Sequence, residues 1–116
     1  MTEIIWYKTG RRPVTPWGAA DSRQTFGLGV SFYSTPSHGG FYVDRTREAV
    51  LDERLREVGI TAKQARFGYP TGWYEEDCAA LAVVFAFPEL FPRDDPQEAL
   101  DQLRYWLTPA KDRNRS

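Results

Sequence analysis

The sequence predicts a compact α+β domain, in which an antiparallel β-sheet of about three to four strands packs against two C-terminal helices. Three observations support this fold class. From Phe26 to Tyr33 large and small side chains alternate, which is the two-residue period of a strand. Apolar residues fill Ala79–Phe87, the body of the segment Trp73–Phe87, and return at helical spacing after Asp95. The chain has 116 residues, which is an ordinary size for one domain.

The N-terminal half is expected to supply the strands. Ile4–Tyr7 predicts a short first strand. Phe26–Tyr33 predicts a longer strand with one buried face, and Ser34–Gly40 is rich in turn residues. Phe41–Val43 then returns as a strand. The last three segments together predict a β-hairpin.

Two shorter helical segments are expected after this hairpin. Asp44–Val58 is charged and partly helical in pattern, and Gly59 is well placed to end it. Ile60–Phe67 predicts a short helical turn with Thr61 as a candidate cap.

The two main helices are expected towards the C-terminus. Trp73–Phe87 predicts a central helix, because apolar residues cover nearly its whole circumference. A strand is the alternative for Ala82–Phe87, where Val and Phe favour β-structure. Asp95–Glu98 is typical of a helix start, since Asp caps, Pro suits the first turn and Glu can reach back. This helix is expected to end before Pro109.

Composition excludes several classes of protein. The formal net charge is −1, so no strong direct binding to nucleic acid is expected. The longest apolar run, Ala79–Phe87, is too short for a membrane span, and the first ten residues carry no signal-peptide pattern. One cysteine fits a reducing compartment. We therefore expect a cytoplasmic protein of the host cell without membrane contact, with one domain over residues 1–110 and a disordered polar tail over 111–116.

Two polar segments are candidates for chemistry. Ser37–Gly40 contains the one histidine of the chain, and Glu75–Cys78 places three carboxylates and the one thiol at an expected helix start. The plainer interpretations are a polar hairpin tip and charges that suit a helix dipole. We expect no catalytic residue, bound metal or cofactor. The alternative is a small hydrolase or metal-dependent enzyme that uses His38 with Glu76, Asp77 or Cys78.

The two polar segments, taken together with their neighbours, resemble a known family. The order is Trp17-Gly18, then Phe32–Phe41 with its Ser37-His38-Gly39-Gly40 turn, then Arg45, then the Trp-Tyr-Glu-Glu-Asp-Cys segment Trp73–Cys78. This order resembles a small domain of unknown function in phage, plasmid and other mobile-element proteins of bacteria, over Pro16–Phe87. The resemblance implies a counter-defence role, as in anti-CRISPR proteins, which inhibit a CRISPR effector subunit or its nuclease by direct binding. It transfers no catalytic residue.

High aromatic content favours a role in protein binding. Four Trp, six Tyr and seven Phe exceed what a small core needs, and Trp and Tyr are frequent interface hot spots. We also expect the histidine turn and the acidic segment to lie close together. The residues expected to bind the host defence protein are Trp17, Tyr33, His38, Tyr42, Tyr69, Trp73, Tyr74, Glu75 and Glu76.

Overall fold

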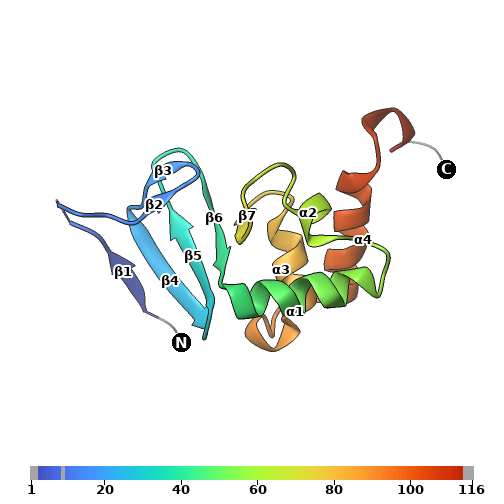
Figure 1. Cartoon of the computed structure of the whole chain (residues 1–116), viewed down its shortest axis with the longest axis horizontal. Helices are drawn as coiled ribbons and strands as arrows, with labels where there is room; N and C mark the ends of the chain where they lie inside the picture. Colours follow the sequence, from blue (N-terminus) through green and yellow to red (C-terminus); the bar gives the residue numbers. More distant parts are fainter. Residues whose placement is uncertain (1–2, 9, 114–116) are drawn as a thin grey trace.

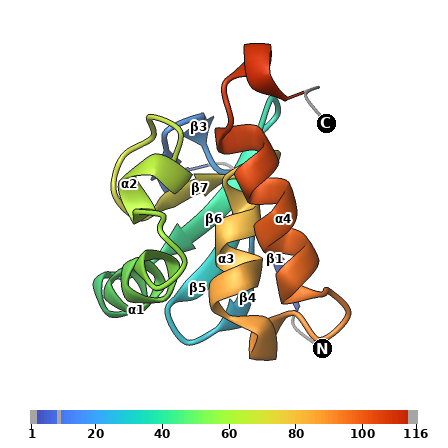
Figure 2. The same ribbon diagram turned by 90° about the vertical axis from the view of Figure 1, so that its right-hand side faces the viewer.

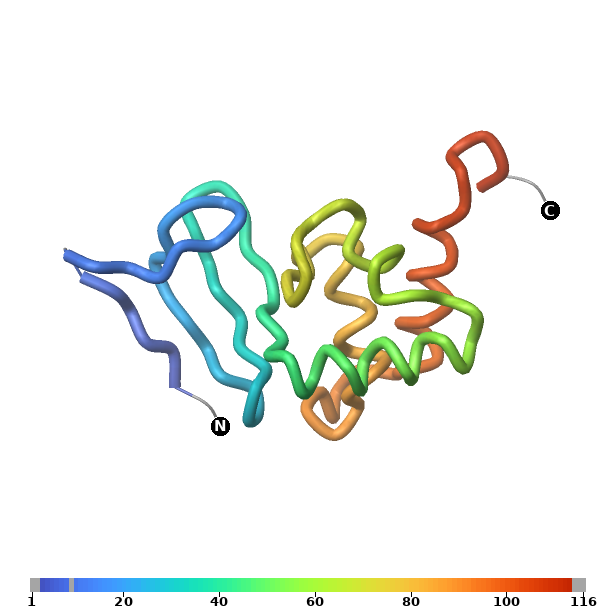
Figure 3. Tube along the Cα trace, in the orientation of Figure 1, coloured from blue at the N-terminus to red at the C-terminus, as the bar shows by residue number. Residues whose placement is uncertain are grey.

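The fold was obtained as a computed structural model, and it describes residues 3–8 and 10–113. It confirms the α+β class. A five-stranded antiparallel sheet in the order β1-β4-β5-β6-β7 lies beside the helices along the long axis of the molecule (Figure 1). The chain runs from β1 at one end of this axis to the C-terminal helix at the other (Figure 3). The sheet has more strands than expected, because one predicted strand is divided between β4 and β5 and because β7 lies in a segment predicted as helix.

The strands of the main sheet are β1 (Ile4–Trp6), β4 (Ser22–Gly27), β5 (Val30–Ser34), β6 (Gly39–Val43) and β7 (Trp73–Glu75). A separate hairpin pairs β2 (Val14–Thr15) with β3 (Gly18–Ala19). The helices are α1 (Arg45–Arg56), α2 (Ala62–Ala65), α3 (Ala80–Ala86) and α4 (Pro96–Leu107), with 3-10 turns η1 (Pro88–Leu90) and η2 (Ala110–Asp112).

The predicted strand Phe26–Tyr33 is in fact the end of β4, a tight turn and most of β5. The chain reverses at Leu28 and Gly29, and Leu28 is 91% exposed. Gly29 has a φ of 82°, a backbone conformation that favours glycine. Alternation continues through so short a turn, so the two-residue period does not reveal it. The second half of the predicted hairpin is confirmed as β5 paired with β6.

The predicted helix Trp73–Phe87 is also two elements. Its first three residues form β7, which pairs with β6, and α3 begins only at Ala80. Trp and Tyr favour strands, and the open edge of β6 offers backbone partners. Within Ala82–Phe87 the helix is confirmed up to Ala86, so the strand alternative is wrong.

The core lies where the helices meet the β6–β7 end of the sheet. Figure 2 shows α3 between α4 and this part of the sheet. Val83 of α3, Leu51 of α1 and Leu103 of α4 are each fully buried in one cluster with Phe41 and Tyr74 from the sheet. Figure 1 shows that the helices lie at the β6–β7 end of the sheet, away from β1.

Most predicted helix ends are confirmed. Gly59 has a φ of 84° just after α1, and Thr61 makes a reciprocal capping box with Gln64 at α2. The Asp95 carboxylate accepts from the Gln97 amide at 2.9 Å. Glu98 does not reach back to this cap: its carboxylate accepts from the side chain of Gln102.

The polar tail expected over residues 111–116 lies only partly within the described residues. There, η2 forms a 3-10 turn, and the Arg113 guanidinium donates to the backbone carbonyls of Thr108 and Trp106. Residues 114–116 lie outside the described residues. Over the part of the chain that the structure describes, no helix combines the length and apolarity needed to cross a membrane.

Candidate functional site

Five aromatic rings gather against one face of the sheet. We call this group the aromatic face, and it consists of Trp17, Tyr33, Tyr42, Tyr69 and Trp73. Trp73 is central: its ring centroid lies 5.7 Å from that of Trp17, 5.6 Å from Tyr33 and 4.9 Å from Tyr42. Trp17 in turn meets Tyr69 edge-on at 5.4 Å. Tilted and edge-to-face pairs at these distances are favourable, so the rings support one another.

Strand register explains why these rings share a face. Tyr42 of β6 stands directly opposite Trp73 of β7. Side chains alternate between the two faces of a sheet, so the neighbouring Phe41 and Tyr74 point to the other side, into the core. Tyr33 of β5 lies on the same face as Tyr42, since it is paired with Gly40, two residues away.

The glycine pair Gly39-Gly40 leaves room for a ring on each side of β6. A Cβ on Gly40 would clash with the Trp17 ring and would lie 2.7 Å from the Tyr74 carbonyl oxygen. A Cβ on Gly39 would lie 2.8 Å from the Phe32 ring. The two glycines of the Ser37–Gly40 turn thus have a packing role, with Trp17 on the aromatic face and Phe32 on the core face.

The aromatic face is half-buried, and Tyr42 is its most exposed member at 37%. Tyr74, which was expected at the surface with the other rings, is instead fully buried. Tyr74 follows Trp73 on β7, so its side chain points to the opposite face of the sheet. It therefore cannot contact a protein that binds the folded chain. The other five aromatic residues expected to bind a partner form the aromatic face together.

An acidic cluster borders the aromatic face. Glu75, Glu76 and Asp77 bring carboxylate oxygens within 4.8 Å of one another. Glu75 pairs with Gly40 across β6 and β7, which puts its side chain on the same face as the rings. Burial raises the pKa of the Glu75 carboxyl, although the Asp77 amide opposes this by donating to it. In the expected helix these three acids would diverge, but a strand end followed by a turn brings them together.

The histidine turn lies next to this acidic cluster, as the sequence predicted. The Glu76 amide donates to the Gly39 carbonyl at 2.9 Å. Thr35 fixes the turn, since its hydroxyl donates to the His38 carbonyl at 2.7 Å and accepts from the His38 amide. His38 and Glu76 line one shallow hollow of about 240 Å³.

The thiol of Cys78 is not set up as a nucleophile. Burial, followed by the negative charges of Glu75 and Asp77, raises its pKa. The thiol therefore stays protonated at neutral pH, whereas a nucleophilic cysteine needs a lowered pKa. Among the described residues, the cluster that could hold a metal contains neither His38 nor Cys78.

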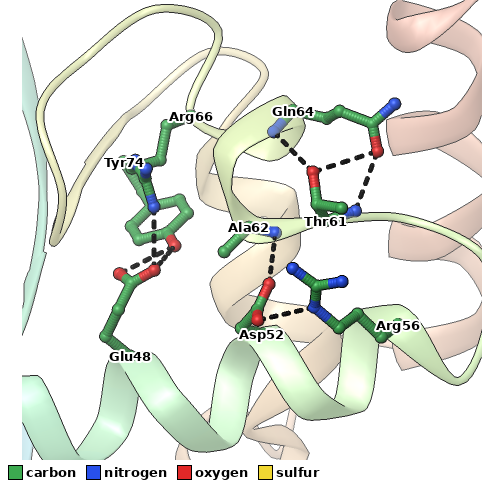
Figure 4. Close-up of polar contacts among 8 residues, drawn as sticks. All are labelled: Glu48, Asp52, Arg56, Thr61, Ala62, Gln64, Arg66 and Tyr74. Atoms are coloured by element: carbon green, nitrogen blue, oxygen red, sulfur yellow. Dashed lines mark hydrogen bonds and ion pairs between the residues drawn. The ribbon is translucent and has the colours of Figure 1, made fainter.

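A buried polar network, which the sequence did not predict, joins Tyr74 to Glu48 and Arg66 (Figure 4). The Tyr74 hydroxyl donates to the Glu48 carboxylate, with its oxygen 2.9 and 2.8 Å from the two carboxylate oxygens. Arg66 pairs with the same carboxylate at 2.9 Å, and both charged side chains are only 13% exposed. Burial and the Glu48 charge raise the pKa of Tyr74. These partners come from α1, β7 and the end of α2, so no local spacing in the sequence marks them.

Comparisons with known proteins identify the family. A protein-family model described as a domain of unknown function (DUF7007) matches residues 11–112, so the chain belongs to this family. No match was found among curated proteins or among solved structures.

Proposed function

We propose that this member of the DUF7007 family is a protein-binding domain that inhibits a partner by covering part of its surface. The observation that carries the proposal is the aromatic face with the acidic cluster at its border. The partner surface that suits this combination is basic and rich in arginine. The proposed partner class, a CRISPR effector subunit or its nuclease, presents such a surface to nucleic acid, and the family resemblance suggests the counter-defence role.

The chemistry of the site supports an arginine-rich partner. Guanidinium groups stack on the faces of Trp and Tyr rings, and they pair with carboxylates through two parallel hydrogen bonds. Trp73 and Tyr42 offer rings on the aromatic face, and Glu76 and Asp77 are exposed carboxylates beside it. An arginine side chain that reached this border would meet both kinds of group.

The packing of the rings also supports binding. Trp73 is held by three neighbouring rings, so little side-chain freedom is left to lose when a partner docks. Preorganised aromatic residues of this kind are typical interface anchors. The enzyme alternative has less support, because the raised pKa of Cys78 opposes its use as a nucleophile.

Affinity capture with matched variants tests the proposal. The immobilised chain is exposed to a lysate of a CRISPR-bearing bacterium, and retained proteins are identified by mass spectrometry. Tyr42→Ala removes the most exposed ring of the aromatic face. Tyr105→Ala is the matched control, because Tyr105 is 45% exposed on α4 and lies outside that face.

We expect a CRISPR effector subunit or nuclease to be retained by the wild-type chain and by Tyr105→Ala, and to be lost with Tyr42→Ala. Captured proteins that depend equally on both tyrosines, or on neither, would contradict binding through the aromatic face. A captured protein that depends on Tyr42 but has no nucleic-acid-binding surface would leave the face in place and refute the partner class.

A further inference from the structure

A second feature, independent of the aromatic face, is a basic hollow between α1 and α2. We call it the α1–α2 hollow, and its volume is about 340 Å³. The chain as a whole has a net charge of −1, and four other hollows on the described surface have no excess of cations. The charged side chains that line the α1–α2 hollow are Arg45, Arg56, Lys63 and Arg66, against Glu48 and Asp52.

One of these arginines, Arg66, is held in place by two hydrogen bonds within the chain. The Arg66 guanidinium pairs with Glu48 through one terminal nitrogen, and its Nε donates to the Tyr69 carbonyl at 3.3 Å. The Tyr74 hydroxyl holds the same carboxylate, so Glu48 has bonds on both oxygens. Arg66 is therefore a cation held in a fixed position at the edge of the hollow.

A second arginine has the same arrangement (Figure 4). The Asp52 carboxylate accepts from the Ala62 amide at 2.8 Å and from Arg56 Nε at 2.7 Å. These two bonds lower the pKa of Asp52, the amide having the larger effect. Both terminal nitrogens of Arg56 remain without a hydrogen bond among the residues that the structure describes. The Asp52 carboxylate is thus already engaged, and the fork of Arg56 is free.

The other two cations add charge without a counter-ion. Neither the Arg45 side chain nor the Lys63 side chain makes a hydrogen bond or ion pair within residues 3–8 and 10–113. In this hollow each carboxylate oxygen of Glu48 and Asp52 already accepts a bond, whereas the cations have unused donors. A hollow with four cations against two carboxylates, both of which are already hydrogen-bonded, suits an anion.

We propose that the α1–α2 hollow binds a phosphate group carried by a small molecule. Arginine forks match the geometry of phosphate oxygens, and lysine adds a compact positive charge. A volume of about 340 Å³ lies within the usual range for small-molecule sites. A nucleic-acid backbone is the weaker candidate, since the net charge of −1 gives no general attraction for a polyanion.

Titration with inorganic pyrophosphate tests this proposal, with the ¹⁵N-labelled chain at low ionic strength and NMR as the readout. Saturable shifts are expected at the amides of α2 and at the side-chain Nε–H signals of Arg56 and Arg66. The double variant Arg45→Gln/Lys63→Gln should raise the dissociation constant about tenfold, which is about 1.4 kcal/mol. Arg93→Gln is the matched control, because Arg93 is an exposed cation beside Asp94 in other hollows.

Several outcomes would overturn the proposal. One is the absence of saturable shifts up to roughly 10 mM pyrophosphate, where binding would be negligible. Another is a loss of affinity in Arg93→Gln as large as that in Arg45→Gln/Lys63→Gln. Tighter binding of a short single-stranded DNA at the same residues would replace the small molecule with a nucleic-acid backbone. Binding of ADP at the same residues would support the site. An affinity equal to that of pyrophosphate would show recognition of the phosphates alone, and a higher affinity would point to a nucleotide.

Discussion

Replacing Tyr74 with phenylalanine tests the buried network that joins β7 to α1. The hydroxyl of this fully buried ring donates to the Glu48 carboxylate at 2.8–2.9 Å. A hydrogen bond to a charged group contributes about 1.5–3 kcal/mol, and we expect Tyr74→Phe to lower the free energy of unfolding by that amount. Arg66 still pairs with Glu48 in the variant, so the chain should fold and the loss should be measurable.

Urea denaturation measures this loss, and Tyr33→Phe is the matched control. Within the described residues the Tyr33 hydroxyl makes no hydrogen bond, so its removal should change stability by no more than about 0.5 kcal/mol. The Tyr74→Phe midpoint should fall by about 1 M urea with an unchanged slope. Equal midpoints for the two variants would refute the argument that the Glu48 network stabilises the fold.

The same variant should change the response to alkaline pH. Burial and the Glu48 charge raise the pKa of Tyr74 above the ordinary tyrosine value of about 10. The unfolded chain therefore loses this proton first, and stability falls as pH rises above about 10, by up to roughly 1.4 kcal/mol per pH unit. Tyr74→Phe should show a shallower decline than the wild type in that range. An identical decline would mean that Tyr74 titrates in the same way in both states.

Three further substitutions test the packing and the caps. Gly40→Ala should destabilise the fold by about 1–3 kcal/mol and alter the near-UV circular dichroism of Trp17, because a methyl group there meets that ring and the strand backbone; a wild-type spectrum and stability would contradict this packing. Leu103→Ala should lower the free energy of unfolding by about 2–5 kcal/mol, as expected for a fully buried leucine. Phe85→Ala should lower it by less, because the Phe85 ring is only half-buried. A thermal or urea midpoint for Leu103→Ala equal to that of the wild type would refute the core assignment. Asp95→Ala should cost about 1 kcal/mol through the lost helix cap, and a larger loss from Asp94→Ala would place the start of α4 elsewhere.

The helix ends marked by caps and glycine stops could be predicted because their signals are local. Asp95 and Pro96 mark the start of α4 within two residues, and Gly59 marks the end of α1. Such capping and stop signals depend on the chain within one turn of the helix. The sequence alone is enough to place them.

The errors fall where a distant strand decides the local structure. Trp73–Glu75 forms a strand because β6, about thirty residues earlier in the chain, offers it a free edge. The turn at Leu28-Gly29 was missed because alternation continues through it. Only the pairing partner shows where such a strand begins and ends.

The sequence indicated which aromatic residues to consider for the candidate site, but it did not predict how they are arranged. The aromatic residues near loops were recognised as candidate anchors, but strand parity decides which of them share a face. Trp73 and Tyr74 are neighbours in sequence, yet one lies on the aromatic face and the other in the core. Because this segment was predicted as a helix, the alternation of side chains between two sheet faces was not expected. The hydrogen bond from Tyr74 to Glu48 was not predicted either.

The affinity of a purified partner for variants of the aromatic face tests the central claim most directly. For a captured CRISPR effector subunit or nuclease, Tyr42→Ala should raise the dissociation constant by at least about thirtyfold, or about 2 kcal/mol, and Tyr105→Ala should leave it unchanged. His38→Ala and Cys78→Ala should have smaller effects than Tyr42→Ala on binding and on inhibition. Equal affinities for Tyr42→Ala and Tyr105→Ala would contradict the account. Loss of inhibition in His38→Ala or Cys78→Ala, in a chain that still folds and binds the partner, would also contradict it and would point to catalysis.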